Sequence, residues 1–337
     1  MSKDNLLFIY THKSTFVEND IKILQKEHCV YEYRFNNSSS INLIISLVKI
    51  FLFLITNFFK FKLIYIWFAD YHSLIPTLYS YLRGIKCYIV IGGYDICRDR
   101  RYNYGSFNSW YRGFFAIKSM RYATLNLCVS KYVLRTIKAI CPKCNAQIVY
   151  NGVEIATKNS VLKDRGIGVL MVALVSRKQT LYIKGIDRLF NLAIATPKLN
   201  FTLVGCNYNL IKENFKNIPK NINIIPYLPK QQLDQIYKNT HVYCQLSRSE
   251  SFSLSLAEAM SYGCIPFISN VGGMAEVTNN FGIKISQLEL DNHIEKVSEK
   301  LLSLYNNSLK NEEYQSHIIK NFSLDSREKA LKKAIYN

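Results

Sequence analysis

The sequence predicts an α/β protein with two doubly wound, Rossmann-like domains. Its 337 residues are too many for one ordinary α/β domain and enough for two. Short apolar runs alternate with helical patterns, which is typical of βαβ units and a parallel sheet. The runs are hydrophobic along their whole length, as in strands that are covered on both faces. After a polar stretch the series starts again, and this restart indicates the second domain.

The two series of apolar runs give the strands that we expect. In the first half they are Leu6–Tyr10, Leu63–Phe68, Cys87–Ile91, Leu125–Val129 and Gln147–Tyr150. In the second half they are Val169–Val175, Phe201–Val204, Ile222–Pro226, Val242–Leu246 and Ile265–Ile268. Between the two series, residues 153–166 are polar and poor in strand formers, so we expect the linker there.

The segment Ile41–Phe59 is apolar enough to be compared with a membrane span. Its polar residues recur at helical intervals and form one narrow stripe. A lysine near the middle of a lone span, here Lys49, costs about 2.5–3.5 kcal/mol on insertion scales. The strand Leu63–Phe68 also follows almost at once. The sequence therefore favours a helix buried on the first sheet, or one partly exposed and resting on lipid, over a true span.

The positive charge is large and uneven. The formal net charge is +19, with +12 in residues 1–150 and +7 in the remainder. From Arg101 to Tyr150 there is no acidic residue. Such a field attracts phosphates, whether in nucleic acid, an anionic bilayer or a pyrophosphate-linked substrate. A basic surface that serves only solubility is the alternative.

The cysteines do not indicate a secreted protein. There are nine, without the regular spacing of a disulfide framework. The one Cys-x-x-Cys, Cys141 to Cys144, has no second pair to complete a zinc site. The apolar run near the N-terminus is too short for a signal peptide. We therefore expect a reducing, cytoplasmic environment.

The stretch after the strand Val242–Leu246 carries the chemistry. It continues as a loop with Glu250, a short helix that contains Glu258 and ends at Gly263, and another strand. A helix that starts after a strand presents free amides and a positive dipole end, which together attract an anion. One carboxylate could accept bonds from a sugar and the other from a ribose. The alternative is that Glu250 caps the helix and Glu258 is a solvated surface residue.

The wider pattern resembles the family-4 retaining glycosyltransferases of the GT-B fold. Their hallmark, Glu-x7-Glu followed by Ala-Met-x-x-Gly-x-Pro, stands here as Glu250, Glu258, Ala259, Met260, Gly263 and Pro266. The turn Gly272-Gly273 and Glu276 also match. The resemblance extends to Arg177 and to Lys184-Gly185, where family members hold the donor diphosphate with the Arg and Lys side chains.

The resemblance implies a donor site for a nucleoside diphosphate sugar, with a UDP-sugar expected. Glu250 would orient the sugar and Glu258 the ribose, and the loop at Tyr227 and Leu228 would hold the base. The amides at the helix tip would face the phosphates; this tip consists of Phe252, Ser253, Leu254 and Ser255. The resemblance also implies retention at the anomeric carbon, an outcome that residue spacing does not establish. No Asp-x-Asp occurs, so neither a metal nor another cofactor is expected.

The resemblance also implies a domain organisation. Residues 1–152 would form the acceptor-binding domain, 153–318 the donor-binding domain facing it across a cleft, and 319–337 a C-terminal helix returning to the first domain. Asn151-Gly152-Val153-Glu154 resembles the family's interdomain junction.

The first domain departs from the family pattern. The loop after its first strand is not rich in glycine, and the histidine that would face the donor sugar is missing. Asp95, in Ile91-Gly-Gly-Tyr-Asp95, remains, and we expect it to touch the reacting sugar or the acceptor hydroxyl. A structural aspartate that bonds the Gly92–Gly93 amides is the alternative. His72 is a weaker candidate for such a contact.

The function expected is that of a retaining, metal-independent, hexosyltransferase-type glycosyltransferase. Its acceptor would be a glycan, either a lipid-linked or a polysaccharide intermediate, at the cytoplasmic face of an anionic membrane. The residues expected to meet that acceptor or membrane are Arg98, Arg100, Arg101 and Arg112. A nucleotide-sugar epimerase of the same fold is one alternative. A basic nucleic-acid-binding protein is another, but no known recognition pattern supports a nucleic-acid partner.

Overall fold

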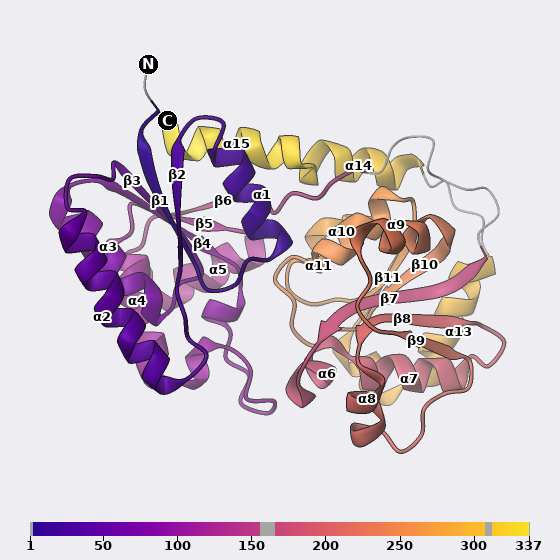
Figure 1. Ribbon diagram of the computed structural model, residues 1–337. Helices are drawn as coiled ribbons and strands as arrows, with labels where there is room; N and C mark the ends of the chain where they lie inside the picture. Colours follow the sequence, from indigo (N-terminus) through magenta and orange to yellow (C-terminus); the bar gives the residue numbers. More distant parts are fainter. Residues whose placement is uncertain (1–2, 156–165, 307–311, 337) are drawn as a thin grey trace. The chain divides into compact units, whose positions relative to one another are not determined.

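The structure, a computed structural model, describes residues 3–155, 166–306 and 312–336. The chain forms two compact units, which we call unit 1 and unit 2 (Figure 1). Unit 1 consists of Met1–Asn151 and Glu328–Asn337, and unit 2 of Gly152–Arg327. The predicted linker, residues 153–166, lies mostly outside the described residues.

Unit 1 is built on a six-stranded parallel sheet with the order β2-β1-β3-β4-β5-β6. The strands are β1 (Asn5–Tyr10), β2 (Cys29–Arg34), β3 (Leu63–Trp67), β4 (Lys86–Ile91), β5 (Leu125–Cys128) and β6 (Ala146–Ile148). The helices are α1 (Thr15–Leu24), α2 (Ser40–Thr56), α3 (Tyr71–Arg83), α4 (Trp110–Tyr122) and α5 (Lys131–Ile140), with short 3₁₀ helices at Tyr94–Ile96 and Ser106–Asn108. Every strand predicted for this half is confirmed. β2 was missed because it is an edge strand whose side chains are exposed or half-buried rather than continuously apolar.

Unit 2 repeats this plan with the order β12-β11-β10-β7-β8-β9, again all parallel. The strands are β7 (Ile167–Val175), β8 (Phe201–Cys206), β9 (Ile222–Ile225), β10 (Thr240–Gln245), β11 (Ile265–Ser269) and β12 (Ile283–Ile285). The helices are α6 (Lys178–Lys184), α7 (Ile186–Ala195), α8 (Tyr208–Asn214), α9 (Lys230–Asn239), α10 (Leu254–Ser261), α11 (Met274–Thr278), α12 (Gln287–Asn292), α13 (Ile294–Asn306) and α14 (Glu312–Phe322). The predicted strands of this half are confirmed, and the three-residue β12 was too short to be seen in the sequence.

The C-terminal helix α15 (Leu324–Tyr336) begins in unit 2 and ends in unit 1. Within unit 1, Lys26 and Lys332 form ion pairs with Glu328 and Glu27. The hydroxyl of Tyr336 lies 2.7 Å from Nε2 of His28. These contacts fix the last turns of the chain to the unit in which the chain started.

The helix predicted at Ile41–Phe59 is present as α2. Of the two arrangements expected, it has the partly exposed one and is not buried on the first sheet, while its contact with lipid stays a prediction. Only Ser46, Ile50 and Leu54 of α2 are buried. A row of large aliphatic and aromatic side chains instead faces outward. No helix within the described residues is both long and apolar enough to cross a membrane.

Candidate functional site

The strand order of unit 2 places two of the predicted site loops side by side. β7 and β10 are neighbours in the sheet, and the order reverses between them. In doubly wound sheets, ligands bind outside the carboxyl ends of the strands at such a reversal. The loop after β7 leads to Arg177, the N-cap of α6, and the loop after β10 carries Glu250. The topology therefore brings the predicted phosphate cation and the predicted catalytic carboxylate to one edge of the sheet.

Lys184 and Glu250 are in direct contact at this edge. Nζ of Lys184 lies 2.6 Å from Oε2 of Glu250, and both side chains are mostly buried. A Cβ at Gly185, where φ is +75°, would lie 2.1 Å from the carbonyl oxygen of Leu246. A Cβ at Gly272 would lie 1.6 Å from the carbonyl oxygen of Glu250. Because only glycine allows these approaches, the two motif glycines set the position of the Lys184–Glu250 pair.

Arg177 lies at the same edge but does not join that pair. It is exposed, and its side chain makes no ion pair or hydrogen bond with the residues that the structure describes. Its φ and ψ of −143° and 152° are extended, as is usual for an N-cap residue. The guanidinium therefore remains available to an anion that reaches this edge.

Gln245, the last residue of β10, links Glu250 to the start of α10. Nε2 of Gln245 donates to Oε2 of Glu250 over 3.0 Å, and Oγ of Ser253 donates to Oε1 of Gln245 over 2.5 Å. Ser253 is the N-cap of α10, and its φ of +75° is a left-handed conformation that costs a non-glycine residue about 1–2 kcal/mol. Gln245 was not among the site residues predicted from the sequence. The signal was there, because a polar side chain inside an apolar strand must find hydrogen-bond partners.

Glu258 lies further along α10 and faces α9. The hydroxyl of Tyr237 donates to Oε2 of Glu258 over 3.3 Å. Burial raises the pKa of the Glu258 carboxyl, although nearby Lys230 acts to lower it. Glu258 is therefore not the solvated surface residue of the alternative interpretation. The loop of Tyr227 and Leu228 leads directly into α9, so this loop and Glu258 both adjoin that helix.

The tip of α10 offers backbone groups more than side chains. Phe252 is buried, and its ring packs on Phe322 with centroids 5.4 Å apart. Leu254 and Ser255 are half-buried in the first turn. An anion at this tip would therefore meet amides and the helix dipole. Within residues 3–155, 166–306 and 312–336, no cluster of His, Cys, Asp or Glu side chains could hold a metal ion.

A protein-family model covers this part of the chain. The model, described as glycosyl transferases group 1, matches residues 171–324. The match supports the resemblance to group 1 glycosyltransferases over this part of the chain. The matched range contains all four charged residues that the motif singled out, namely Arg177, Lys184, Glu250 and Glu258.

Similar proteins support the same placement of this glycosyltransferase domain. Glycogen synthase from Elusimicrobium minutum is 27% identical over 116 residues, which are 33% of this chain and 24% of that protein. The chain thus matches about a quarter of the length of this relative. Sucrose-phosphate synthase from Thermosynechococcus elongatus superposes with a TM-score of 0.77 at 13% identity over 98% of both chains. HepE from Anabaena, solved with UDP-glucose, gives a TM-score of 0.69 at 14% identity over 98% of this chain and 99% of that chain. The predicted GT-B fold is thereby confirmed.

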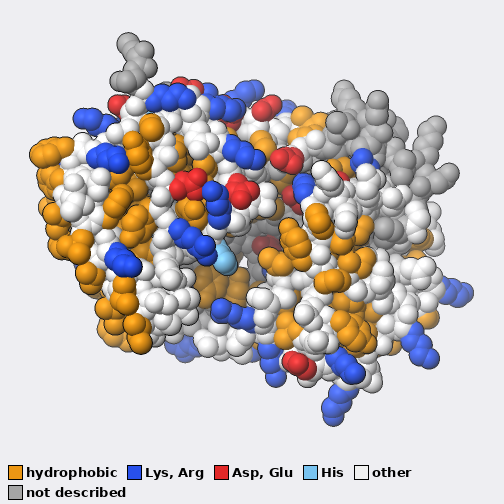
Figure 2. All heavy atoms as spheres, in the orientation of Figure 1, with side chains coloured by type: hydrophobic (Ala, Val, Ile, Leu, Met, Phe, Trp, Pro, Cys, Tyr) orange, Lys and Arg blue, Asp and Glu red, His pale blue; other side chains and the backbone are white. Residues whose placement is uncertain are grey.

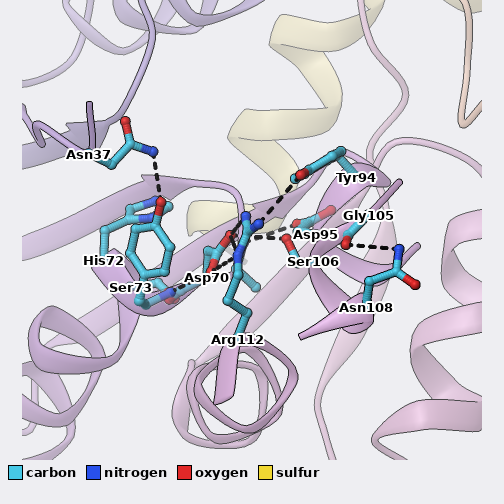
Figure 3. Close-up of polar contacts among 12 residues, drawn as sticks. Asn37, Asp70, His72, Ser73, Tyr94, Asp95, Gly105, Ser106, Asn108 and Arg112 are labelled. Atoms are coloured by element: carbon cyan, nitrogen blue, oxygen red, sulfur yellow. Dashed lines mark hydrogen bonds and ion pairs between the residues drawn. The ribbon is translucent and has the colours of Figure 1, made fainter. Parts of the chain in front are cut away.

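In unit 1 of this GT-B protein, a polar cluster follows β3 (Figure 3). Nε of Arg112 lies 3.1 Å from both carboxylate oxygens of Asp70, and Oγ of Ser106 donates to the same carboxylate over 3.0 Å. The guanidinium also contacts the hydroxyl of Tyr94 over 3.4 Å. Arg112 was predicted to meet the acceptor or a membrane. In the structure its charge is paired with Asp70 inside unit 1, and its contact with an acceptor or a membrane stays a prediction.

Asp95 is completely buried and not at an accessible edge. Its Oδ1 accepts from the amide of Gly93 over 2.7 Å and its Oδ2 from the amide of Ala69 over 3.0 Å. Burial raises the pKa of this carboxyl to about 7, against the effect of the two amides. The structure therefore favours the alternative role, in which Asp95 holds the loop after β4, over contact with the reacting sugar. His72 is also buried, with Nε2 3.0 Å from the carbonyl oxygen of Trp67.

The remaining predicted arginines of unit 1, Arg98, Arg100 and Arg101, are exposed. They lie between the two 3₁₀ segments, close in sequence to the cluster around Asp70. Their contact with an acceptor or a membrane stays a prediction.

Proposed function

We propose that the chain is a retaining glycosyltransferase that moves a sugar from a nucleoside diphosphate sugar to an acceptor hydroxyl. The observation that carries the proposal is the contact between Lys184 and Glu250, at the strand reversal of a group 1 glycosyltransferase domain. Cation and carboxylate come from segments 66 residues apart, and two glycines with no room for a Cβ hold them together. Such a pair fits a donor whose diphosphate is anionic and whose sugar carries hydroxyl groups.

The donor is proposed to be a UDP-sugar, and no cofactor or metal is proposed. Arg177, Lys184 and the amides at the tip of α10 would stabilise the charge that the diphosphate gains as it leaves. Each charge-assisted contact of this kind contributes about 1.5–3 kcal/mol. Glu258 would bind the ribose and the loop at Tyr227 the base. UDP-glucose in HepE, which has the same fold, supports this choice of nucleotide.

Donor binding would then change the partner of Lys184. In the structure its ammonium group is paired with Glu250. A diphosphate would draw the ammonium group toward itself and leave the Glu250 carboxylate, still held by Gln245, free to accept bonds from sugar hydroxyls. In the transfer step the bond from the anomeric carbon to the diphosphate breaks. The oxygen of the acceptor hydroxyl forms its bond to that carbon on the same face and passes its proton to the departing diphosphate, which gives retention.

The acceptor is proposed to be a lipid-linked or polysaccharide intermediate at the cytoplasmic face of a membrane, bound by unit 1. The support is electrostatic, because residues 1–150 carry +12 of the net charge and the exposed arginines between the 3₁₀ segments lie there. Phosphate-bearing acceptors are attracted by such a surface.

A thermal-shift screen against nucleoside diphosphates and their sugars tests the donor site first. A ligand that binds only the folded state raises Tm by mass action, so one nucleotide should stand out. The double change Arg177→Ala and Lys184→Ala should abolish that shift, whereas Lys178→Ala, an exposed neighbour in α6, should keep it. Full sugar transfer by the double variant would refute the assigned phosphate site.

A further inference from the structure

The outward face of α2 is the largest departure of unit 1 from an ordinary soluble surface. Large apolar side chains along α2 and the turn after it are between 42% and 77% exposed. This face, which we call the α2 face, consists of Ile41, Ile44, Ile45, Val48, Phe51, Leu52, Ile55, Phe58 and Phe59. Figure 2 shows hydrophobic side chains gathered on the side of unit 1 where α2 lies. Contiguous exposed apolar surface of this kind marks an interaction site.

The helix α2 departs from an ordinary amphipathic surface helix, because most of its apolar side chains are exposed. A surface helix normally buries its apolar stripe and exposes its polar residues. In α2, only Ser46, Ile50 and Leu54 are buried. The apolar side chains of the α2 face, which are spaced three and four residues apart, are exposed. At 17 residues α2 is about 25 Å long, shorter than the roughly 30 Å of a hydrocarbon core. The geometry fits a helix that lies in a membrane interface and not one that crosses it.

All charged residues in the stretch of chain that contains α2 are positive. Between Glu32 and Asp70 there is no acidic residue, and the cations there are Arg34, Lys49, Lys60 and Lys62. At one end, the guanidinium of Arg83 lies 4.5 Å and 4.6 Å from the ring centroids of Phe58 and Phe59. Next to Arg83, Leu82 is 83% exposed. An apolar face with cations at its margin matches the interface of an anionic bilayer.

We propose that the α2 face binds the surface of an anionic lipid bilayer, with Phe51, Leu52 and Ile55 entering the acyl boundary and Lys49 and Lys60 contacting lipid phosphates. A second copy of this chain is a poorer occupant. A two-fold contact through the α2 face would bring the same cations against one another. An anionic bilayer supplies both apolar chains and negative charge, whereas the α2 face of a second copy supplies apolar side chains without the negative charge.

The proposal extends the proposed function by naming the surface that would bring unit 1 to a lipid-linked acceptor. It does not depend on catalysis for its test, because binding to vesicles is measured without donor or acceptor. A failure to bind lipid would therefore leave the donor-site assignment standing, and a failure of donor binding would leave this proposal standing.

Flotation of the purified full chain with vesicles tests the proposal. The wild type should float with vesicles of phosphatidylcholine mixed with phosphatidylglycerol and much less with phosphatidylcholine alone. Phe51→Glu with Ile55→Glu should weaken binding to the anionic vesicles at least tenfold, since two inserted side chains become charged. Lys49→Gln and Lys60→Gln should each weaken it about fivefold.

The matched control is Ile194→Glu, which introduces the same charge at a similarly exposed isoleucine, 57% accessible, on α7 of unit 2. It should float like the wild type. If the double glutamate variant loses its cooperative melting transition, Phe51→Ser with Ile55→Ser carries the same expectation. Wild-type flotation of a folded α2 variant would overturn the proposal. Equal flotation of the wild type with anionic and neutral vesicles would also overturn the proposal. The same holds if gel filtration shows a dimer that substitutions in the α2 face dissociate while flotation is unchanged.

Discussion

Gln245→Leu should reduce both the stability of unit 2 and the rate of sugar transfer. The side chain of Gln245 is 2% exposed and joins the Glu250 carboxylate to the strained N-cap residue Ser253. Leucine nearly preserves the volume and removes these two bonds, together with the longer contacts to Tyr243 and Ser247. A hydrogen bond to a charged group contributes about 1.5–3 kcal/mol and one to a neutral hydroxyl about 0.5–1.5 kcal/mol. We therefore expect a loss of about 2–4 kcal/mol in the free energy of unfolding.

The loss should be visible as a lower Tm and a slower reaction. For a unit of this size, about 2–4 kcal/mol lowers Tm by roughly 5–10 °C. With Glu250 no longer held by Gln245, kcat should fall about tenfold or more while KM for the donor changes little, because orientation matters most in the transition state. Thr240→Val is the matched control, as Thr240 is a buried polar residue at the other end of β10. It should lower Tm slightly and leave kcat unchanged.

A double-mutant cycle with Ser253→Gly separates the two roles. Glycine adopts a φ of +75° without strain and has no hydroxyl to bond Gln245. In that background Gln245→Leu should cost about 1–2 kcal/mol less than in the wild type. Additive effects on stability, or a Gln245→Leu variant with wild-type Tm and kcat, would refute the reasoning.

Other changes test the remaining parts of the site. Lys184→Met should raise KM for the donor at least tenfold, as one charge-assisted phosphate contact is lost, and steady-state kinetics would detect it; an unchanged KM would contradict the role. Arg112→Met should destabilise unit 1 by about 3 kcal/mol in urea melts, because the Asp70 carboxylate is left buried without its partner. Because of Asp95, the free energy of unfolding should decrease as pH rises. The pKa of Asp95 is about 7 in the folded state against 3.8 ordinarily, so between those values the unfolded chain loses its proton first. The fall should reach up to about 4 kcal/mol at about 1.4 kcal/mol for each pH unit. Asp95→Asn should flatten that part of the profile, and an unaltered profile would show that another group causes it.

The sequence alone was enough for the sheets and for the position of the donor motif. Continuous apolar runs located the strands, because strands covered on both faces cannot accommodate polar side chains. Edge strand β2 escaped this rule. The position of the donor motif was predicted from the spacing of Glu250 and Glu258 and from the glycines at 185 and 272, since each of these residue types reflects a local constraint. Glycine stands where a Cβ would strike a backbone oxygen.

Only the tertiary structure decided which partners these residues meet. In the sequence, Asp95 and Arg112 were equally compatible with a surface role. The burial of Asp95 and the pairing of Arg112 with Asp70 depend on loops that residue types do not specify. Periodicity revealed a stripe on α2 without revealing its orientation, because the apolar and the polar side of a helix repeat with the same period. Gln245 gained its meaning from Glu250 and Ser253, which the turn after β10 brings back to it. Sequence patterns record local preferences, whereas burial and hydrogen-bond partners are properties of the folded chain as a whole.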